Sequence, residues 1–319
     1  MAAHHQAPVL ASLAEAGLQA GTAVLAPGEA AKTLAQAERL WNAMLRFGLD
    51  RGSVVVALGG GVVTDLAGFV AATYMRGIAW VAVPTSLLGQ VDASVGGKTA
   101  VDHPACKNLI GAFHQPAAVL ADVGALATLP EEELRTGLAE VVKHAMIRDA
   151  GLFDILESHT DALLMCDPVR LEEVIARSVR IKAEVVMADE RESGLRRILN
   201  YGHTIGHAIE SASLAAGAAM THGRAVALGM VAEARLAERR GLVDAKVVER
   251  QRRLLARFGL PVALADLPDP DRLLDLLRHD KKAAAGRLRF VLPTAVGAVT
   301  EADDVTDDEV REAIAALRG

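Results

Sequence analysis

Cysteine and aromatic residues are scarce in this chain of 319 residues. The two cysteines, Cys106 and Cys166, are too few for a disulfide framework or a zinc knuckle. Aromatic residues make up only 3% of the chain, so the core must be packed mainly with Ala, Val, Leu and Ile.

Long apolar stretches are also missing. No uninterrupted run approaches the roughly 20 residues that a membrane-spanning helix needs. The first residues show neither the basic region nor the apolar core of a secretory signal. We therefore expect a cytoplasmic protein that does not insert into a membrane.

Basic residues are not in excess. The chain has 34 Lys and Arg against 40 Asp and Glu, which gives a net charge of −6 and argues against binding to nucleic acid or to an anionic membrane. Hydrophobic residues make up 51% and charged residues 23%, a globular composition. The length suggests roughly two domains.

The first part of the chain alternates strand and helix patterns. Short apolar runs predict strands at 53–58, 79–83 and 118–121, and a helix follows the first of them from about 64 to 74. This order is typical of βαβ units with a parallel sheet, whose ligands bind beyond the carboxyl ends of the strands. The glycines 59–61 and the pair Thr85 and Ser86 lie at such ends.

Helical patterns dominate the rest. We predict helices at 131–149, 168–189, 204–213, 222–240 and 243–258, a strand at 288–292 that pairs with 296–300, and a final helix that begins with a capping box at Thr306. The sequence therefore predicts an α/β fold: a Rossmann-like parallel-sheet domain, 1–123, followed by a mainly α-helical domain, 124–319.

The glycine turn at 59–61 is one candidate binding site. Backbone N–H groups at such a turn can approach a pyrophosphate closely. The run is not a GxGxxG fingerprint, so a tight turn without a ligand is an equally good interpretation. Asp65, in the first turn of the predicted helix, is either a helix-stabilising carboxylate or a ribose contact.

Three histidines form a second candidate. His203 and His207 are four residues apart, on one helical face, and His222 follows in a similar context of small residues. Two histidines and a carboxylate with open positions would make a catalytic metal site. A histidine pair at this spacing is common without a metal, so both interpretations remain open.

Charged side chains offer further candidates. Glu140 and Lys143 lie one turn apart in an apolar stretch, as a buried pair or, with a slight preference, as a surface pair. We interpret His144, on the same helix, as structural. Several cations would suit an anionic substrate if the fold gathers them, although each alone fits a solvated surface charge: Arg76, Lys98, Lys107, Lys182, Arg196 and Lys281.

Taken together, the motifs resemble the 3-dehydroquinate synthase family. They run colinearly from about residue 27 to the C-terminus. The segments that carry the resemblance are 59–65 (GGGVVTD), 84–88 (PTSLL), 91–100 (VDASVGGKTA), 107–113 (KNLIGAF), 137–143 (GLAEVVK), 182–184, 189–192, 194–196, 200–207 (NYGHTIGH), 222–223 and 280–282 (DKK).

The resemblance implies an NAD- and metal-dependent lyase of the shikimate pathway. Its substrate would be a small anionic sugar phosphate, 3-deoxy-D-arabino-heptulosonate 7-phosphate, and its products 3-dehydroquinate and phosphate. The family oxidises one hydroxyl with bound NAD, eliminates phosphate, reduces the carbonyl again and closes a ring by an intramolecular aldol reaction.

The resemblance also implies site residues. A zinc or cobalt ion would be held by Glu140, His203 and His222, which reverses the preference for a surface Glu140. NAD would be bound by Glu29, Lys32, Gly60, Gly61, Asp65, Thr85, Ser86, Lys98, Lys107 and Thr128. The catalytic and substrate-binding set would be Asp92, Lys98, Lys107, Asn108, Lys143, Lys182, Arg196, Asn200, His207 and Lys281, with Arg76 supplied by the neighbouring subunit of a homodimer.

Three alternatives remain at this point. Related sugar phosphate cyclases act on sedoheptulose 7-phosphate or glucose 6-phosphate, which lack the carboxylate that Lys182 and Arg196 would suit. A metal-dependent polyol dehydrogenase shares the architecture and the glycine turn. The family also begins with a strand pair and a first sheet strand that we do not find before residue 27, so we expect an incomplete sheet, and a copy without turnover is the third alternative.

Overall fold

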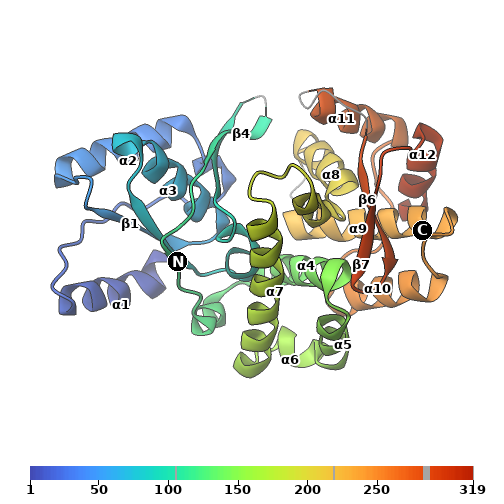
Figure 1. The fold of residues 1–319 in the computed structure, drawn as a ribbon, viewed down its shortest axis with the longest axis horizontal. Coiled ribbons are helices and arrows are strands. Elements are labelled where there is room, and N and C mark those ends of the chain that lie inside the picture. The colour runs from blue at the N-terminus through green and yellow to red at the C-terminus, as the bar shows by residue number, and fades with distance from the viewer. Residues whose placement is uncertain (105, 218–219, 283–287, 319) are drawn as a thin grey trace. The chain divides into compact units, whose positions relative to one another are not determined.

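The chain folds into two compact units, residues Met1–Leu134 and Arg135–Gly319. The computed structural model describes residues 1–104, 106–217, 220–282 and 288–318, with the backbone alone for 279–282 (Figure 1). The domain boundary predicted after residue 123 lies before the end of unit 1 at Leu134, at the start of the short helix η4 (Val123–Thr128). That domain boundary stays a prediction.

Unit 1 is built on a three-stranded parallel sheet in the order β1-β2-β5. Strand β1 (Val54–Gly59) pairs with β2 (Ala79–Pro84), and β2 pairs with β5 (Ala118–Val119). These are the three strands that the apolar runs predict. Helix α3 (Gly61–Thr73) connects β1 to β2 and carries the buried side chains of Leu66, Phe69 and Val70 into the same core as Trp80.

The remaining elements of unit 1 surround this core. Buried Ala37 and Met44 of α2 join it. The other bounds are α1 (Ala2–Glu15), η1 (Glu29–Ala31), α2 (Leu34–Phe47), η2 (Tyr74–Arg76), the π-helix η3 (Gly89–Ala93), β3 (Lys98–His103) and β4 (Cys106–Phe113).

The antiparallel hairpin of β3 and β4 is absent from the sequence prediction. Lys98 pairs with Phe113 and His103 with Cys106, with an irregularity between Val101 and His103. Most residues of β4 are exposed. A strand with neither a buried face nor strict alternation lacks the pattern that identifies strands, so the sequence did not predict this hairpin.

Unit 2 is mainly helical, as predicted. Each of the five predicted helices is present with ends shifted by at most two residues. The helices are α4 (Glu131–Arg148, which begins in unit 1), α5 (Ala150–Ser158), α6 (Thr160–Leu164), α7 (Pro168–Ala188), α8 (His203–Ala215), α9 (His222–Arg239), α10 (Ala245–Arg257), α11 (Pro270–Lys282) and α12 (Asp307–Ala315), with the short η5 (Leu195–Asn200) and η6 (Ala316–Arg318).

A β-hairpin interrupts the helices of unit 2 near its end. Strand β6 (Phe290–Ala295) pairs antiparallel with β7 (Ala298–Ala302), which confirms the predicted strand pair. The capping box before α12 is also present: the hydroxyl of Thr306 accepts a hydrogen bond from the backbone N–H of Glu309, whose carboxylate accepts one from the backbone N–H of Thr306.

Helices α8 and α9 lie side by side at an unusually close distance (Figure 1). A Cβ atom added at Gly229 of α9 would lie 1.9 Å from the carbonyl oxygen of Gly202, and one added at Gly206 of α8 would lie 3.0 Å from the carbonyl oxygen of Ala225. Small residues at these positions let the two backbones approach.

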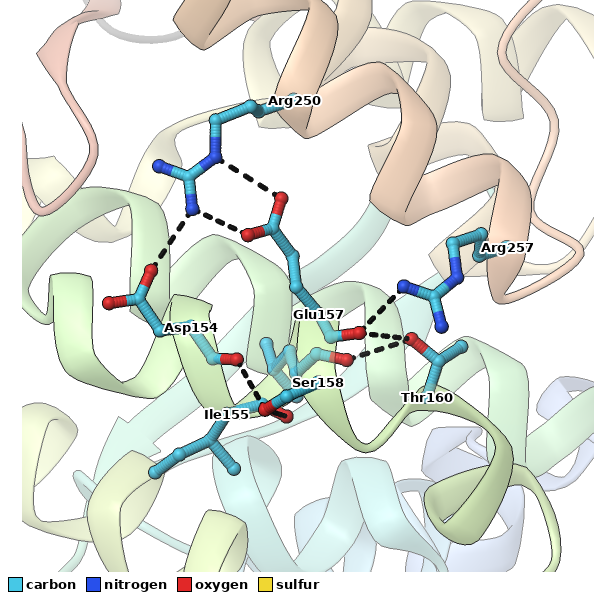
Figure 2. A network of polar contacts seen from close by, with 8 residues as sticks. Asp154, Ile155, Glu157, Ser158, Thr160, Arg250 and Arg257 are labelled. Atoms are coloured by element: carbon cyan, nitrogen blue, oxygen red, sulfur yellow. Dashed lines mark hydrogen bonds and ion pairs between the residues drawn. The ribbon is translucent and has the colours of Figure 1, made fainter.

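A polar network fixes α10 to α5. The guanidinium of Arg250 donates to both carboxylate oxygens of Glu157 and to Asp154, and it stacks 5.1 Å from the ring centroid of Phe153. Figure 2 shows that Arg257, about two helical turns after Arg250 on α10, donates to the backbone carbonyl of Glu157. These contacts hold the outer helices of unit 2 together.

Among the described residues, no helix combines the length and the apolarity that a bilayer crossing requires.

Candidate metal centre and cofactor site

Unit 2 brings a carboxylate and two imidazoles together from three helices. Glu140 lies on α4, and His203 and His222 are the first residues of α8 and α9. The Nε2 atoms of His203 and His222 each lie 3.5 Å from Oε1 of Glu140. One ligand atom from each of the three residues fits within a 4.8 Å cluster, which is the arrangement of a three-ligand metal site.

Glycine places His222 near Glu140. A Cβ atom at Gly223 would lie 2.5 Å from the backbone of Thr136, so the start of α9 approaches the α4 backbone one turn before Glu140. The hydroxyl of Thr136 also donates to the hydroxyl of Thr221, 3.1 Å away. This close approach lets the His222 side chain reach Glu140.

A buried glutamate holds the start of α8 and with it His203. The carboxylate of Glu233 accepts hydrogen bonds from the backbone N–H of Gly202 at 2.6 Å and of Ile205 at 3.3 Å. Gly202 has a left-handed φ of 78°. The negative charge of Glu233 therefore satisfies N–H groups that the first turn of a helix otherwise leaves open.

The Nδ1 atoms of both imidazoles are engaged elsewhere. Nδ1 of His203 lies 3.1 Å from the carbonyl oxygen of Tyr201, and Nδ1 of His222 lies 3.1 Å from Oε2 of Glu210. A carbonyl oxygen can only accept, so Nδ1 of His203 carries the proton and its Nε2 presents a lone pair toward Glu140.

The third histidine of the predicted trio lies beside the other two. The ring centroid of His207 is 5.2 Å from that of His203 and 5.9 Å from that of His222. His207 is exposed and shares a cluster with Glu210 and His222 instead of with Glu140. The helical spacing therefore puts the pair on one face, as predicted, but only His203 faces the carboxylate.

Burial and charge set the protonation of the cluster. Burial alone would raise the pKa of Glu140, but the charges of Lys143, His203 and His222 hold that pKa well below its usual value. Burial lowers the pKa of His203 to about 3. Burial also opposes charge on His222, yet its polar contacts with the carboxylates of Glu140 and Glu210 raise its pKa to about 10.

The donor set fits a divalent metal ion. Glu140 is fully buried, and within the described residues neither of its carboxylate oxygens accepts a hydrogen bond of regular geometry. Lys143 forms an ion pair with Glu140, and the two Nε2 atoms converge on the same oxygen. Two nitrogen donors and one oxygen donor suit zinc or cobalt and leave positions open for a substrate.

Buried cations lie in the same unit. Lys143 on α4, Lys182 on α7 and Arg196 in η5 have exposed fractions of 1%, 7% and 2%. The surface-pair interpretation of Glu140 and Lys143 is therefore wrong: the pair is buried, as the family resemblance implies. Residues 136–147 of α4 are all buried, so no exposed face distinguishes the pair from its neighbours, and spacing alone did not reveal the burial.

A short loop holds Arg196 and Asn200. The carboxylate of Asp189 accepts backbone hydrogen bonds from Gly194 at 2.7 Å and Arg196 at 3.0 Å. Asn200 donates to Oε1 of Glu192, 2.8 Å away, and Glu192 has a left-handed φ of 59°. The side chain of Lys281, the last predicted substrate contact in unit 2, lies outside the described residues.

Unit 1 contains the predicted cofactor turn. The backbone N–H of Thr85, just after β2, donates to the carbonyl of Gly59 at 3.0 Å, which joins the two strand ends. The Thr85 hydroxyl is buried and has no hydrogen-bond partner among the described residues. A Cβ atom at Gly60 would lie 3.2 Å from Oγ of Ser86. An open backbone and a buried hydroxyl fit a dinucleotide phosphate.

Lys32 contacts three other predicted binding residues. Its ammonium donates to Asp65 at 2.5 Å and to the side-chain oxygen of Asn108, and it lies 3.9 Å from Glu29. Asp65 is not in the first turn of α3, because that helix begins at Gly61 instead of near residue 64. In the structure, Asp65 forms an ion pair with Lys32. Burial raises the pKa of Glu29 in spite of Lys32.

The other predicted residues of unit 1 are spread over its surface elements. Asp92 lies in η3 and is half-buried, whereas Lys98 of β3 and Lys107 of β4 are exposed. Thr128 accepts or donates a hydrogen bond at 2.8 Å with Nε2 of His5, from α1. Arg76 is exposed with a left-handed φ of 69°.

Three glutamates of unit 2 that were not predicted contact a site residue or the turn that positions one. Glu192 contacts Asn200, Glu210 contacts His222, and Glu233 supports the turn before His203. One sequence signal existed for Glu210, which follows His207 by three residues and so shares its helical face. The contacts of Glu233 depend on the packing of α9 against α8, which no local pattern encodes.

Comparison with known proteins agrees with this geometry. Residues 22–136 match the sequence profile described as 3-dehydroquinate synthase N-terminal, and residues 137–283 match the one described as 3-dehydroquinate synthase C-terminal. A 3-dehydroquinate synthase of Symbiobacterium thermophilum is 52% identical over 309 residues, which are 97% of this chain and 86% of the relative.

Solved structures give the same fold. A 2-epi-5-epi-valiolone synthase from Streptomyces hygroscopicus subsp. jinggangensis, solved with NAD⁺ and Zn²⁺ bound, superposes with a TM-score of 0.92 at 33% identity, over 99% of this chain and 88% of that one. A 2-deoxy-scyllo-inosose synthase complexed with carbaglucose-6-phosphate, NAD⁺ and Co²⁺ gives 0.86 at 30% identity, over 98% and 88%. On these matches, the chain belongs to the 3-dehydroquinate synthase family.

Proposed function

We propose that this chain is a 3-dehydroquinate synthase, a carbon–oxygen lyase that converts 3-deoxy-D-arabino-heptulosonate 7-phosphate to 3-dehydroquinate and phosphate. Family membership over residues 22–283 supports the reaction class. The observation that carries the proposal is the convergence of His203 and His222 on one oxygen of buried Glu140. This cluster is suited to hold a metal ion, which would bind the hydroxyl that is oxidised.

We assign a divalent metal, zinc or cobalt, to Glu140, His203 and His222. We assign NAD to unit 1, at the glycine turn, Thr85 and Ser86, with the other predicted cofactor contacts around them. When bound, NAD would take up and return a hydride within one turnover, and the metal would polarise the hydroxyl being oxidised and later the ketone. The solved relatives that contain NAD⁺ with Zn²⁺ or Co²⁺ support both assignments.

The chain's own cations bind and orient the anionic substrate in this proposal. The basic side chains of Lys143, Lys182 and Arg196 are buried, which suits a carboxylate and a phosphate. Asn200, held by Glu192, adds a hydrogen-bonding group of fixed direction, and His207 adds an imidazole. The substrate phosphate can accept the proton that is abstracted, so positioning contributes more to catalysis than a separate enzyme base.

Two further assignments follow from the family resemblance. We propose that Arg76, exposed on η2, completes the site of a neighbouring subunit in a homodimer. We also propose that the enzyme acts in the cytoplasm.

Another sugar phosphate cyclase activity is the second candidate, because the superposed structures are cyclases with other names. Identity separates the two candidates: 52% to a 3-dehydroquinate synthase against 33% and 30% to the other cyclases. The buried Lys182 and Arg196 also favour a substrate that carries a carboxylate.

The test is phosphate release from three substrates: the heptulosonate 7-phosphate, sedoheptulose 7-phosphate and glucose 6-phosphate, each with NAD and Co²⁺. We expect release from the first alone, without net formation of NADH. The Glu140→Gln variant serves as the blank, and Glu238→Gln, which alters an ion pair with Arg235 outside the cluster, serves as the active control. Release from either of the other sugars assigns a different cyclase, and net NADH without phosphate assigns a dehydrogenase.

A further inference from the structure

The two histidines of the metal cluster share one arrangement. Each turns Nε2 toward Oε1 of Glu140 at 3.5 Å, and each has Nδ1 at 3.1 Å from an oxygen on its other side. For His203 that oxygen is the backbone carbonyl of Tyr201, and for His222 it is Oε2 of Glu210. Both rings are therefore oriented through the nitrogen that faces away from Glu140.

An imidazole binds a metal only through a nitrogen that carries no proton. A neutral histidine has one such nitrogen, and the hydrogen bond made by the other nitrogen decides which one it is. An acceptor at Nδ1 therefore leaves Nε2 free to bind the metal. For His203 the backbone provides this acceptor, whereas for His222 a side chain does.

The position of Glu210 suits this task. It lies on α8, the helix that begins with His203, yet its carboxylate reaches His222 at the start of α9. Its side chain is 17% exposed, so solvent competes only in part for the carboxylate oxygens. One helix thus supplies a histidine of the cluster and the carboxylate that orients the other histidine.

We infer that Glu210 is a positioning residue of the metal site, which accepts the Nδ1 proton of His222 and so directs Nε2 of that ring to the metal. The inference rests on the metal site assigned under the proposed function. An alternative use of the same residues, a second metal held by His207, Glu210 and His222, would engage Nδ1 of His222. We favour the orienting role of Glu210 because it leaves Nε2 of His222 free to bind a metal together with Glu140.

The test removes the acceptor oxygen with little change in side-chain length. Metal-free wild type, Glu210→Met and Glu210→Gln are titrated with Co²⁺ against a competing chelator, and the cobalt absorption spectrum and the thermal unfolding of the metal-free proteins are recorded. Glu238→Met, on α9 and outside the cluster, is the matched control. We expect Glu210→Met to raise the Kd for Co²⁺ by about 10- to 100-fold, with a smaller rise for Glu210→Gln, whose amide oxygen can still accept.

Further readouts separate positioning from general stability. The metal-free Glu210→Met protein should unfold at the same temperature as Glu238→Met, and one Co²⁺ should bind per wild-type chain. In the zinc-loaded wild type with ¹⁵N-labelled histidine, NMR should show a proton on Nδ1 of His222. A Kd for a folded Glu210→Met equal to that of the wild type, a metal-bound Nδ1 or two ions per chain would each overturn the inference. If Glu210→Met does not fold, the NMR measurement on the wild type tests the inference instead.

These readouts use no substrate, so the outcome is independent of the reaction. A wild type that binds no Co²⁺ would refute the metal site itself. A wild type that binds Co²⁺ but releases no phosphate would refute the proposed reaction while the role of Glu210 is still measured.

Discussion

His203 and His222 begin two neighbouring helices, and the Nε2 atom of each lies 3.5 Å from the same oxygen of Glu140. Three helices, α4, α8 and α9, thus each contribute one side chain to the same small volume. The short distance between α8 and α9, the capping of α8 by Glu233 and the close approach of Gly223 to Thr136 all serve this convergence. Each can be tested separately from catalysis.

Removing one imidazole should remove the metal. We expect His203→Ala to lower the metal content of the purified protein from about one ion per chain to less than about a tenth, because the two remaining residues form too few bonds to the ion. Elemental analysis after gel filtration measures this content. His159→Ala, at the junction of α5 and α6, is the control and should keep its metal. Full metal content in His203→Ala would contradict the proposed ligand set.

Gly229→Ala should separate α8 from α9. The new Cβ would lie 1.9 Å from the carbonyl oxygen of Gly202, so the helices must move apart and lose packing. We expect a loss of about 2–4 kcal/mol in the free energy of unfolding and weaker Co²⁺ binding, measured by urea denaturation of the metal-free protein and by titration.

The matched control for this substitution is Gly52→Ala, whose Cβ would meet only Oδ1 of Asp50 at 3.5 Å. Its stability should stay within about 1 kcal/mol of the wild type. Wild-type stability in Gly229→Ala would show that the contact between α8 and α9 is not as close as described.

The pair of Asp149 and Arg177 should make stability depend on pH. Asp149 caps α5 through the backbone N–H of Leu152 and accepts two hydrogen bonds from Arg177. Burial raises its pKa, but Arg177 and the helix cap outweigh burial and lower the pKa below the ordinary 3.8. A lowered pKa in the folded state stabilises the protein above the unfolded pKa, and that contribution is lost as pH falls through the folded value.

The variant Asp149→Asn keeps a capping side chain but loses the charge. We expect it to unfold about 1–2 kcal/mol more easily than the wild type at pH 7, with the difference shrinking below about pH 4. Urea denaturation of the metal-free proteins between pH 7 and the lowest pH at which the wild type folds measures the trend. Asp303→Asn, at an exposed aspartate before α12, is the control. A difference that stays constant with pH would contradict the account.

Much of this fold follows from local patterns. Strands β1 and β2 are apolar runs that end at glycine and proline, and β5 lies in a third short apolar run. The helices of unit 2 have apolar faces and clear starting residues such as Pro168 and Thr306. Local energetics and the final structure agree at these elements, which is why the sequence predicts them. The hairpin of β3 and β4 has no such pattern, since its second strand lies mostly at the surface.

The site could be predicted only in part for a similar reason. The shared helical face of His203 and His207 follows from their spacing, but the carboxylate that completes the cluster comes from a helix more than sixty residues earlier in the chain. Spacing left open whether Glu140 was buried, and the family resemblance decided it. Glu210 and Glu233 have roles that depend on the distance between α8 and α9, a property of packed side chains that no local pattern carries.

The central claim is that one metal, held by Glu140, His203 and His222, is required for the lyase reaction. The most direct measurement is phosphate release from the heptulosonate 7-phosphate by NAD-supplied protein, before and after a chelator has removed the metal and again after Co²⁺ is added back. The account predicts release that stops on chelation and returns with about one Co²⁺ per chain in the wild type, but never in His203→Ala. Undiminished release from the metal-depleted protein, or cobalt-restored release in His203→Ala, would contradict it.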